Sequence, residues 1–152
     1  MRVLFIGGTG NISLPCVAAA LAAGHEVTVL NRGRRSHPFG DRVAELTGDR
    51  AEPGTLESAA EGRPDVVVDF VAYRPGDVEG AIAAFSGRTG QYVFISSTAA
   101  YQKPPRQPVC TEQTPLDNPL WPYARDKIAC EARLVRAHRE EGFPVTIVRP
   151  SY

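Results

Sequence analysis

The chain has 152 residues, enough for one domain with a single hydrophobic core. Its 17 lysine and arginine residues balance 17 aspartate and glutamate residues, which argues against a partner recruited by net charge, such as nucleic acid or an anionic membrane. Three cysteines without paired spacing and three histidines without metal-ligand spacing favour free thiols in a reducing cytoplasm and no metal site. No apolar run reaches the ~18 residues of a membrane span, and an apolar segment begins already at Arg2, so we expect a soluble cytoplasmic domain without a signal peptide.

Strand-like and helix-like segments alternate along the chain. Short runs rich in branched and aromatic residues predict strands at Arg2–Ile6, Glu26–Leu30, Arg42–Leu46, Asp65–Val71, Tyr92–Ser96 and Pro144–Val148. The segments between them predict helices at Asn11–Ala23, Gly54–Gly62, Asp77–Phe85 and Tyr123–Glu141. Such alternation is typical of α/β proteins, in which helical crossovers cover both faces of a parallel sheet. We predict a doubly wound parallel sheet of the Rossmann type with strand order 3-2-1-4-5-6.

One segment, Lys103–Pro122, cannot form regular structure because it holds six prolines. A loop of this length inside a compact domain is more often functional than accidental.

The first predicted strand passes directly into "GGTGNIS", and a glycine-rich turn between strand and helix is the setting of a dinucleotide-binding turn. Gly7 would permit the tight turn, and Gly10 would let a pyrophosphate approach the backbone without a Cβ in the way. The N–H groups near Asn11 and Ile12 would face the phosphates at the positive end of the helix dipole. Ser13 stands where the pattern has a third glycine, which mainly serves close packing, so a small serine weakens the match only slightly. An ordinary turn is the alternative interpretation.

The residues after the second predicted strand indicate the type of dinucleotide. An acidic residue there would accept hydrogen bonds from the ribose hydroxyls of NAD. This chain has "NRGRR" instead, so the segment offers three guanidiniums and no carboxylate. Guanidiniums bind phosphate through charge-assisted and often bidentate hydrogen bonds. The pattern favours NADP over NAD, with Arg32 as the main 2′-phosphate contact and Arg34 or Arg35 as the secondary one; the alternative is a solvated basic loop.

A second group of candidate residues lies further along the chain. "WPYARDKIACE" places Tyr123 and Lys127 four residues apart, hence on one face of the long predicted helix. "YVFISSTAAY" places Ser96 and Ser97 at the carboxyl end of a strand, where ligands bind in open α/β sheets. A lone Tyr-x-x-x-Lys spacing arises easily by chance, but it is specific together with the serine pair and the glycine turn.

With these motifs the sequence resembles the extended short-chain dehydrogenase/reductase family, also called NAD-dependent epimerase/dehydratases, over its whole length. "FIGGTGNIS" and "VLNRGR" are similar to an atypical branch that includes chloroplast stem-loop RNA-binding proteins. The resemblance implies that Ser97, Tyr123 and Lys127 are catalytic and that Ser96 packs beside Ser97. It also implies a set of cofactor-binding residues, namely Gly7, Thr9, Gly10, Asn11, Ile12, Asp49 at the adenine, and Val71, Ala72 and Tyr73 after the fourth strand.

The chemistry implied for these residues is acid–base catalysis coupled to hydride transfer. A tyrosine with a reference pKa of about 10 needs about 4 kcal/mol of stabilisation to ionise near pH 7. For Tyr123, the Lys127 ammonium and a positive nicotinamide ring are the evident sources. Lys127 would also hold the nicotinamide ribose, and Ser97 would bind the substrate oxygen that gains or loses the proton.

Members of this family continue past the "RPSY" segment into a second lobe that closes over the substrate. We therefore interpret residues 1–152 as an NAD(P)-binding Rossmann domain without the C-terminal substrate lobe. Two classes of function follow: an epimerase, dehydratase or reductase for a small molecule, with a nucleotide sugar as one candidate, or a non-catalytic dinucleotide-binding module in regulation or RNA binding. Zero net charge and the lack of an aromatic–basic patch disfavour a nucleic-acid partner. The sequence leaves a homodimer open.

Overall fold

A computed structural model describes residues 1–151 of the chain. Its centre is one six-stranded parallel sheet with the order β3-β2-β1-β4-β5-β6, which confirms the predicted topology. The strands are β1 (Arg2–Ile6), β2 (Glu26–Asn31), β3 (Val43–Thr47), β4 (Val66–Asp69), β5 (Gln91–Ile95) and β6 (Val145–Val148).

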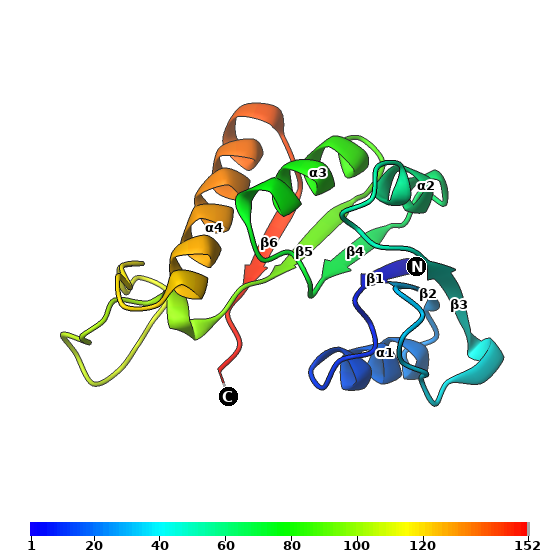
Figure 1. Ribbon diagram of the computed structural model, residues 1–152, viewed down its shortest axis with the longest axis horizontal. Coiled ribbons are helices and arrows are strands. Elements are labelled where there is room, and N and C mark those ends of the chain that lie inside the picture. The colour runs from blue at the N-terminus through cyan, green and yellow to red at the C-terminus, as the bar shows by residue number, and fades with distance from the viewer. Residues whose placement is uncertain (152) are drawn as a thin grey trace.

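Helices lie on both faces of the sheet (Figure 1). The upper face in this view carries α2 (Thr55–Glu61), α3 (Pro75–Phe85) and α4 (Pro122–Glu141), and the lower face carries α1 (Ser13–Ala22). Short 3₁₀ helices lie at Gly40–Arg42 and Thr98–Ala100. The loop between β5 and α4 contains no strand and no α-helix in the described chain after Ala100, as its prolines predict.

Two hydrophobic clusters hold these layers together. The larger lies between the upper face and α2, α3 and α4, and includes Phe85, Tyr92 and Leu134, all fully buried. The smaller lies between α1 and the β1–β3 part of the lower face, around Val17. The three cysteines, Cys16, Cys110 and Cys130, are free thiols, as predicted.

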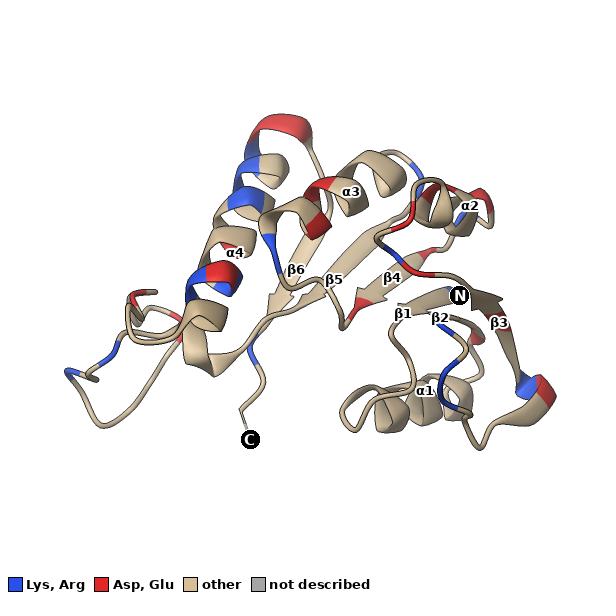
Figure 2. Ribbon diagram, viewed as in Figure 1, with Lys and Arg blue, Asp and Glu red and all other residues tan. Residues whose placement is uncertain are grey.

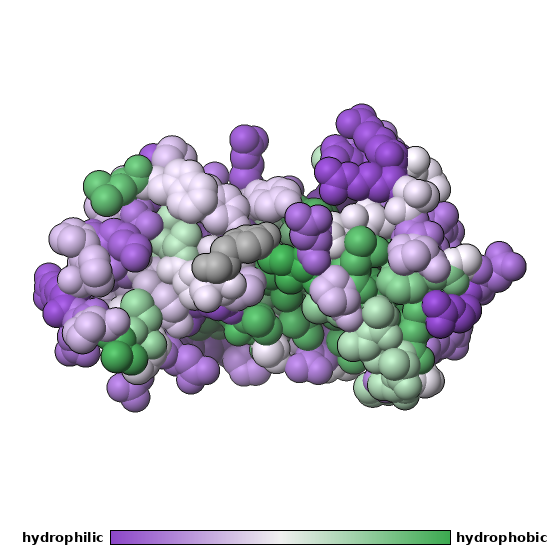
Figure 3. Space-filling view, turned by 90° about the horizontal axis from the view of Figure 1, so that it is seen from below, coloured by the Kyte–Doolittle hydropathy of each residue, from purple (hydrophilic) through white to green (hydrophobic). Residues whose placement is uncertain are grey.

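The lower face is covered unevenly, because α1 contacts β1 and β2. No helix in residues 1–151 covers that face over β5 and β6, where Val93 and Ile95 are half-buried and Val148 is exposed. Apolar side chains gather in the middle of this underside (Figure 3). Within residues 1–151 no helix is both long and apolar enough to cross a bilayer.

Several element bounds differ from the sequence-based expectation by one or two residues, for identifiable reasons. The predicted strand Asp65–Val71 ends at Asp69, since that carboxylate accepts the backbone N–H groups of Val71 and Ala72 and turns the chain. Helix α1 begins at Ser13 rather than Asn11, because Ser13 is hydrogen-bonded back to Gly10 and closes the turn before the helix. The last two helices each begin earlier than predicted, at a proline, which suits a first turn because proline lacks an N–H group.

Candidate functional site

A groove of about 970 Å³ crosses the carboxyl edge of the sheet above the glycine turn. A smaller cavity of about 200 Å³ adjoins it, and both are lined by Gly7, Gly10, Tyr73 and Tyr123. Between them the two cavities bring together all predicted site residues except Ala72, which is fully buried and contributes its backbone carbonyl instead. The groove has two ends, which we name the arginine end (Arg32, Arg34, Arg35, Asp49) and the lysine end (Tyr73, Ser97, Tyr123, Lys127).

The glycine turn lies between the two ends. Gly7 has φ of +84°, and a Cβ at this position would lie 2.5 Å from Cγ1 of Val71. Both its backbone conformation and its close approach to the turn after β4 therefore require glycine. A Cβ on Gly10 would meet only the Ser13 hydroxyl, at 3.4 Å, so this glycine leaves the backbone open toward the cavities.

Ser13 does more than replace a glycine. It is 1% exposed, its Oγ accepts the N–H of Gly10 at 2.8 Å, and it donates to the carbonyl of Gly10 at 3.2 Å. The buried serine thus stabilises the turn by two hydrogen bonds to Gly10, a role that the sequence analysis did not predict. A Gly-x-x-Ser spacing at a strand–helix junction is the signal that could have found it.

The arginine end is exposed and loosely paired. Arg32 Nη1 lies 3.9 Å from Asp49 Oδ2, with the side chains 59% and 37% exposed. Figure 2 shows the basic segment that follows β2 in blue. The basic segment contains no carboxylate, but β3 and the loop after it place two carboxylates close to it. Glu45 accepts a hydrogen bond from Asn31, and Asp49 faces Arg32. Sequence reasoning missed this proximity because it depends on the pairing of β2 with β3.

At the lysine end, Lys127 is buried, with 1% of its surface exposed. Its Nζ donates to the carbonyls of Ala72 and Ile95, at 2.7 Å each. The ammonium also lies 4.6 Å from the ring centroid of Phe94 and 5.8 Å from that of Tyr123. Burial lowers the pKa of Lys127, while the nearby Asp69 and Asp77 carboxylates oppose the shift. The lysine is therefore a fixed part of the site and not a mobile surface charge.

Tyr123 stands in a row of three aromatic rings, two of which, Tyr73 and Tyr123, line both cavities. Its centroid lies 4.8 Å from that of Trp121 and 6.4 Å from that of Tyr73. Ser97 is half-buried beside it in the smaller cavity, and its Oγ accepts the N–H of Ala99 at 3.1 Å. The i, i+4 spacing on α4 thus brings tyrosine and lysine to one end of the groove, as predicted.

A buried ion pair lies behind Ser97. Ser96 is 3% exposed and donates to Glu131, as expected of a packed neighbour. The Glu131 carboxylate also accepts hydrogen bonds from two nitrogens of Arg149, at 3.0 Å and 2.6 Å. A third nitrogen of Arg149 donates to the hydroxyl of Tyr101 at 3.2 Å. This network joins α4, the end of β5 and the segment after β6. No local pattern in the sequence indicates it, since the partners are far apart in the chain.

A parallel sheet of this strand order, with a glycine turn at its central carboxyl edge, defines the Rossmann class of α/β domains. Residues 81–152 match the model of the NAD dependent epimerase/dehydratase family. The chain is 35% identical over 144 residues to a 2′-dehydrokanamycin reductase of Streptomyces kanamyceticus, a match that covers 93% of this chain and 40% of that protein. It is 29% identical over 166 residues to the chloroplast stem-loop binding protein of 41 kDa b of Arabidopsis thaliana, over 99% of this chain and 42% of that protein.

The solved structures agree with these relatives. The fold matches that of UDP-glucose 4-epimerase from Thermus thermophilus, in complex with NAD, with a TM-score of 0.83 and 27% identity, over 98% of this chain and 54% of that one. The chain is therefore related to the NAD-dependent epimerase/dehydratase family, and the resemblance predicted from its motifs is confirmed. It spans about two fifths of the length of these curated relatives, in agreement with a correspondence to their N-terminal part.

Proposed function

We propose that the chain is the dinucleotide-binding part of an NAD(P)-dependent oxidoreductase that transfers hydride at a hydroxyl or carbonyl carbon, as an epimerase, dehydratase or reductase does. The observation that carries this proposal is the meeting of Ser97, Tyr123 and Lys127 around one cavity that adjoins the glycine turn. The reductase and epimerase relatives support it.

The groove residues fit a dinucleotide. The groove's volume of about 970 Å³ lies within the range of cofactor sites, and Gly7 and Gly10, which lack a Cβ, open onto it. The pyrophosphate would lie against the turn, the adenosine against Asp49, and the nicotinamide against the segment after β4. The residues in these roles are Gly7, Thr9, Gly10, Asn11, Ile12, Val71 and Tyr73, while the buried Ala72 would act through its carbonyl, which holds Lys127. Because Arg32 is exposed and only loosely paired, with Arg34 and Arg35 also lining the groove, we propose NADP as the preferred cofactor over NAD.

When bound, the nicotinamide ring would supply or accept the hydride at the substrate carbon. In the reducing direction the Tyr123 hydroxyl gives its proton to the substrate oxygen, and in the oxidising direction the phenolate takes it back. The Lys127 ammonium, close to the Tyr123 ring, favours the phenolate by charge. Ser97 holds the substrate oxygen by a hydrogen bond, and the flanking rings of Tyr73 and Trp121 restrict movement of the tyrosine.

The substrate would be a small molecule. A nucleotide sugar is the candidate supported by the Thermus thermophilus relative, a UDP-glucose 4-epimerase. Residues 1–152 would act as one NAD(P)-binding domain of a cytoplasmic enzyme, with a C-terminal lobe of the whole protein forming the rest of the substrate side.

A second candidate is a non-catalytic dinucleotide-binding module. It is favoured by the 29% identity to a chloroplast stem-loop binding protein. The balanced charge of the chain and the retained Ser97, Tyr123 and Lys127 favour the enzyme.

The test measures turnover and cofactor affinity in the complete natural protein, since the chain spans only part of its relatives. Tyr123→Phe should keep cofactor affinity and lower turnover by about 10²–10⁴-fold, because only the phenolic oxygen is lost. Lys127→Ala should lower both turnover and cofactor affinity. Ser97→Ala should lower turnover alone. Tyr101→Phe, which removes another hydroxyl near the site, is the matched control and should change turnover little. Full turnover in Tyr123→Phe would disprove the mechanism; binding of RNA or a protein that responds to cofactor, without turnover, would favour the module.

A further inference from the structure

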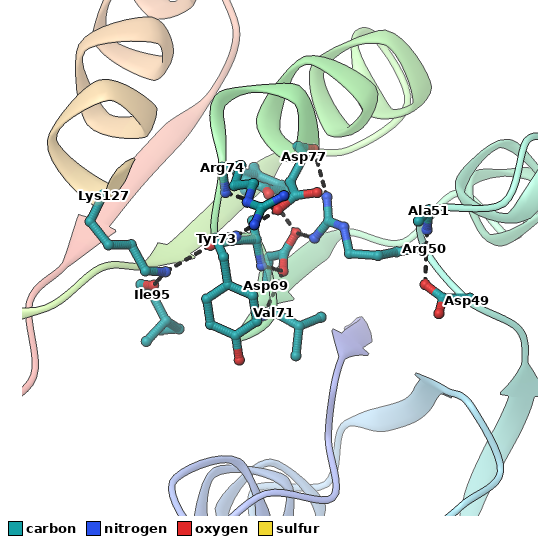
Figure 4. A network of polar contacts seen from close by, with 12 residues as sticks. Asp49, Arg50, Ala51, Asp69, Val71, Tyr73, Arg74, Asp77, Ile95 and Lys127 are labelled. Atoms are coloured by element: carbon teal, nitrogen blue, oxygen red, sulfur yellow. Dashed lines mark hydrogen bonds and ion pairs between the residues drawn. The ribbon is translucent and has the colours of Figure 1, made fainter. Parts of the chain in front are cut away.

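Asp69 is a fully buried carboxylate at the end of β4, where it accepts hydrogen bonds from four donors. Its Oδ1 accepts the backbone N–H groups of Val71 and Ala72, at 3.0 Å and 2.9 Å. Its Oδ2 accepts the hydroxyl of Tyr92 at 2.7 Å and an Nη of Arg50. Figure 4 shows Arg50 extending from the loop after β3 toward this carboxylate. The first pair of bonds shapes the turn after β4, and the second pair fixes the carboxylate itself.

Arg50 connects this carboxylate to a second aspartate, Asp77, whose side chain acts on the same turn. Its other Nη donates to the backbone carbonyl of Asp77 at 2.6 Å. The Asp77 carboxylate accepts the N–H groups of Tyr73 and Arg74, at 2.7 Å and 2.9 Å. Residues 71–74 are therefore held by two aspartates, and one arginine bridges both.

The same turn holds the proposed catalytic lysine. Its Ala72 carbonyl is one of the two acceptors of Lys127 Nζ. The carbonyl of Ile95 is the other, and Figure 4 shows it beside the lysine. The place of the ammonium thus depends on where Ala72 lies, and the place of Ala72 depends on Asp69. Backbone carbonyls carry no net charge. The position of Lys127 beside Tyr123 is therefore fixed by where these two carbonyls lie and not by an ion pair.

We propose that Asp69 and Arg50 are positioning residues for the Lys127 ammonium. The catalytic consequence rests on the proposed function, whereas the positioning itself concerns only groups of this chain. The negative charge of Asp69 also favours the protonated lysine against the cost of its burial. Since Arg50 lines the groove next to Asp49, the network joins the loop at the arginine end to the lysine end.

Residues 1–152 hold two lysines, Lys103 and Lys127, which gives a direct test in the complete natural protein. In protein labelled with ¹³C- and ¹⁵N-lysine, the variants Lys103→Arg and Lys127→Arg identify the exposed and the buried side-chain signal. The exchange of the Lys127 ammonium protons with water should be slow in the wild type and faster in Asp69→Asn by about tenfold, because the charge-assisted hydrogen bonds that fix the turn around Ala72 are weakened. The Lys103 signal should not change.

Leu134→Ala is the matched control for lower stability. Leu134 is fully buried on α4 two turns after Lys127, and its truncation costs about 2–5 kcal/mol without touching the network. It should leave Lys127 exchange within about threefold of the wild type. Arg50→Lys, which keeps a cation beside Asp69, should retain more protection than Arg50→Met.

If Asp69→Asn does not fold, Arg50→Met and the milder Tyr92→Phe make the same test, with faster Lys127 exchange expected in both. Folded variants of Asp69 or Arg50 whose Lys127 exchange matches the wild type, or matches that of Leu134→Ala, would overturn the proposal. None of these measurements needs a cofactor or substrate. Their failure is therefore distinct from failure of the proposed function, which Tyr123→Phe tests by turnover.

Discussion

The two ends of the groove are built in opposite ways. At the arginine end, Arg32 and Asp49 face each other across 3.9 Å with both side chains well exposed. At the lysine end, Lys127 is 1% exposed, and Asp69, which fixes the turn that holds it, is 0% exposed; each makes several hydrogen bonds. Exposed pairs contribute little to stability, whereas buried charges are costly unless every partner is in place.

This difference in burial predicts a different tolerance to substitution at the two ends of the groove. The charges at the arginine end are exposed, so we expect that they can be substituted without disturbing the fold. Lys127 and Asp69 are part of the core, so we expect them to keep one geometry. We therefore expect substitutions of the buried groups behind the lysine end to change stability. Substitutions at the arginine end should change ligand selectivity.

The largest contrast is expected between two aspartates. Asp69→Ala should lower the free energy of unfolding by about 3–5 kcal/mol, because it leaves Arg50 buried without its carboxylate. Asp49→Ala should cost less than about 1 kcal/mol. Urea denaturation of both variants measures the difference, and equal losses would show that burial does not distinguish the two ends.

Gly7→Ala should be the next largest effect, at roughly 2–4 kcal/mol, because a Cβ would clash with Val71 at a backbone conformation that already favours glycine. Gly87→Ala is the control: it also has positive φ, but nothing lies within 4 Å of its Cβ, so strain alone should cost about 1 kcal/mol. Thermal unfolding of both variants separates the contact from the strain. Similar costs would mean that the approach of Val71 has no effect.

Arg32→Ala should leave stability unchanged and weaken NADP binding by about tenfold, the loss of one hydrogen bond to a charged group. Binding of NAD should change by less than about threefold, and Arg88→Ala, an exposed arginine outside the groove, should change neither. Calorimetric titration gives both affinities. Equal affinities for NAD and NADP that Arg32→Ala leaves unchanged would refute the preference.

The smallest effect concerns pH. Burial lowers the pKa of Lys127 below the ordinary lysine value of 10.5, so between these two values the unfolded chain holds a proton that the folded chain lacks. The contribution of Lys127 to the free energy of unfolding should therefore rise with pH across that window. Compared with Lys127→Met, the wild type should gain stability from neutral pH to about pH 10. A constant gap, or a gain by the variant, would contradict the lowered pKa.

The fold was predictable because buried parallel strands and amphipathic helices leave local patterns, as in Arg2–Ile6 and the long α4. The pairing of Tyr123 with Lys127 was predictable because the spacing of two residues on one helix fixes their face. The Asp69–Arg50–Tyr92 contacts were not, since the partners lie 19 and 23 residues away from the aspartate and meet only in the folded sheet. An aspartate inside the apolar run "VVVDFV" was the available signal, because a carboxylate in a buried strand needs partners.

The central claim is that one dinucleotide occupies both ends of this groove, and the side-chain signals of Lys103 and Lys127 test it most directly. On titration with NADP, the Lys127 signal should shift and saturate, because the nicotinamide side of the ligand would lie beside the ammonium. The Lys103 signal should stay in place. Saturation with NADP that leaves Lys127 unmoved, or a shift in Lys103 alone, would contradict the claim.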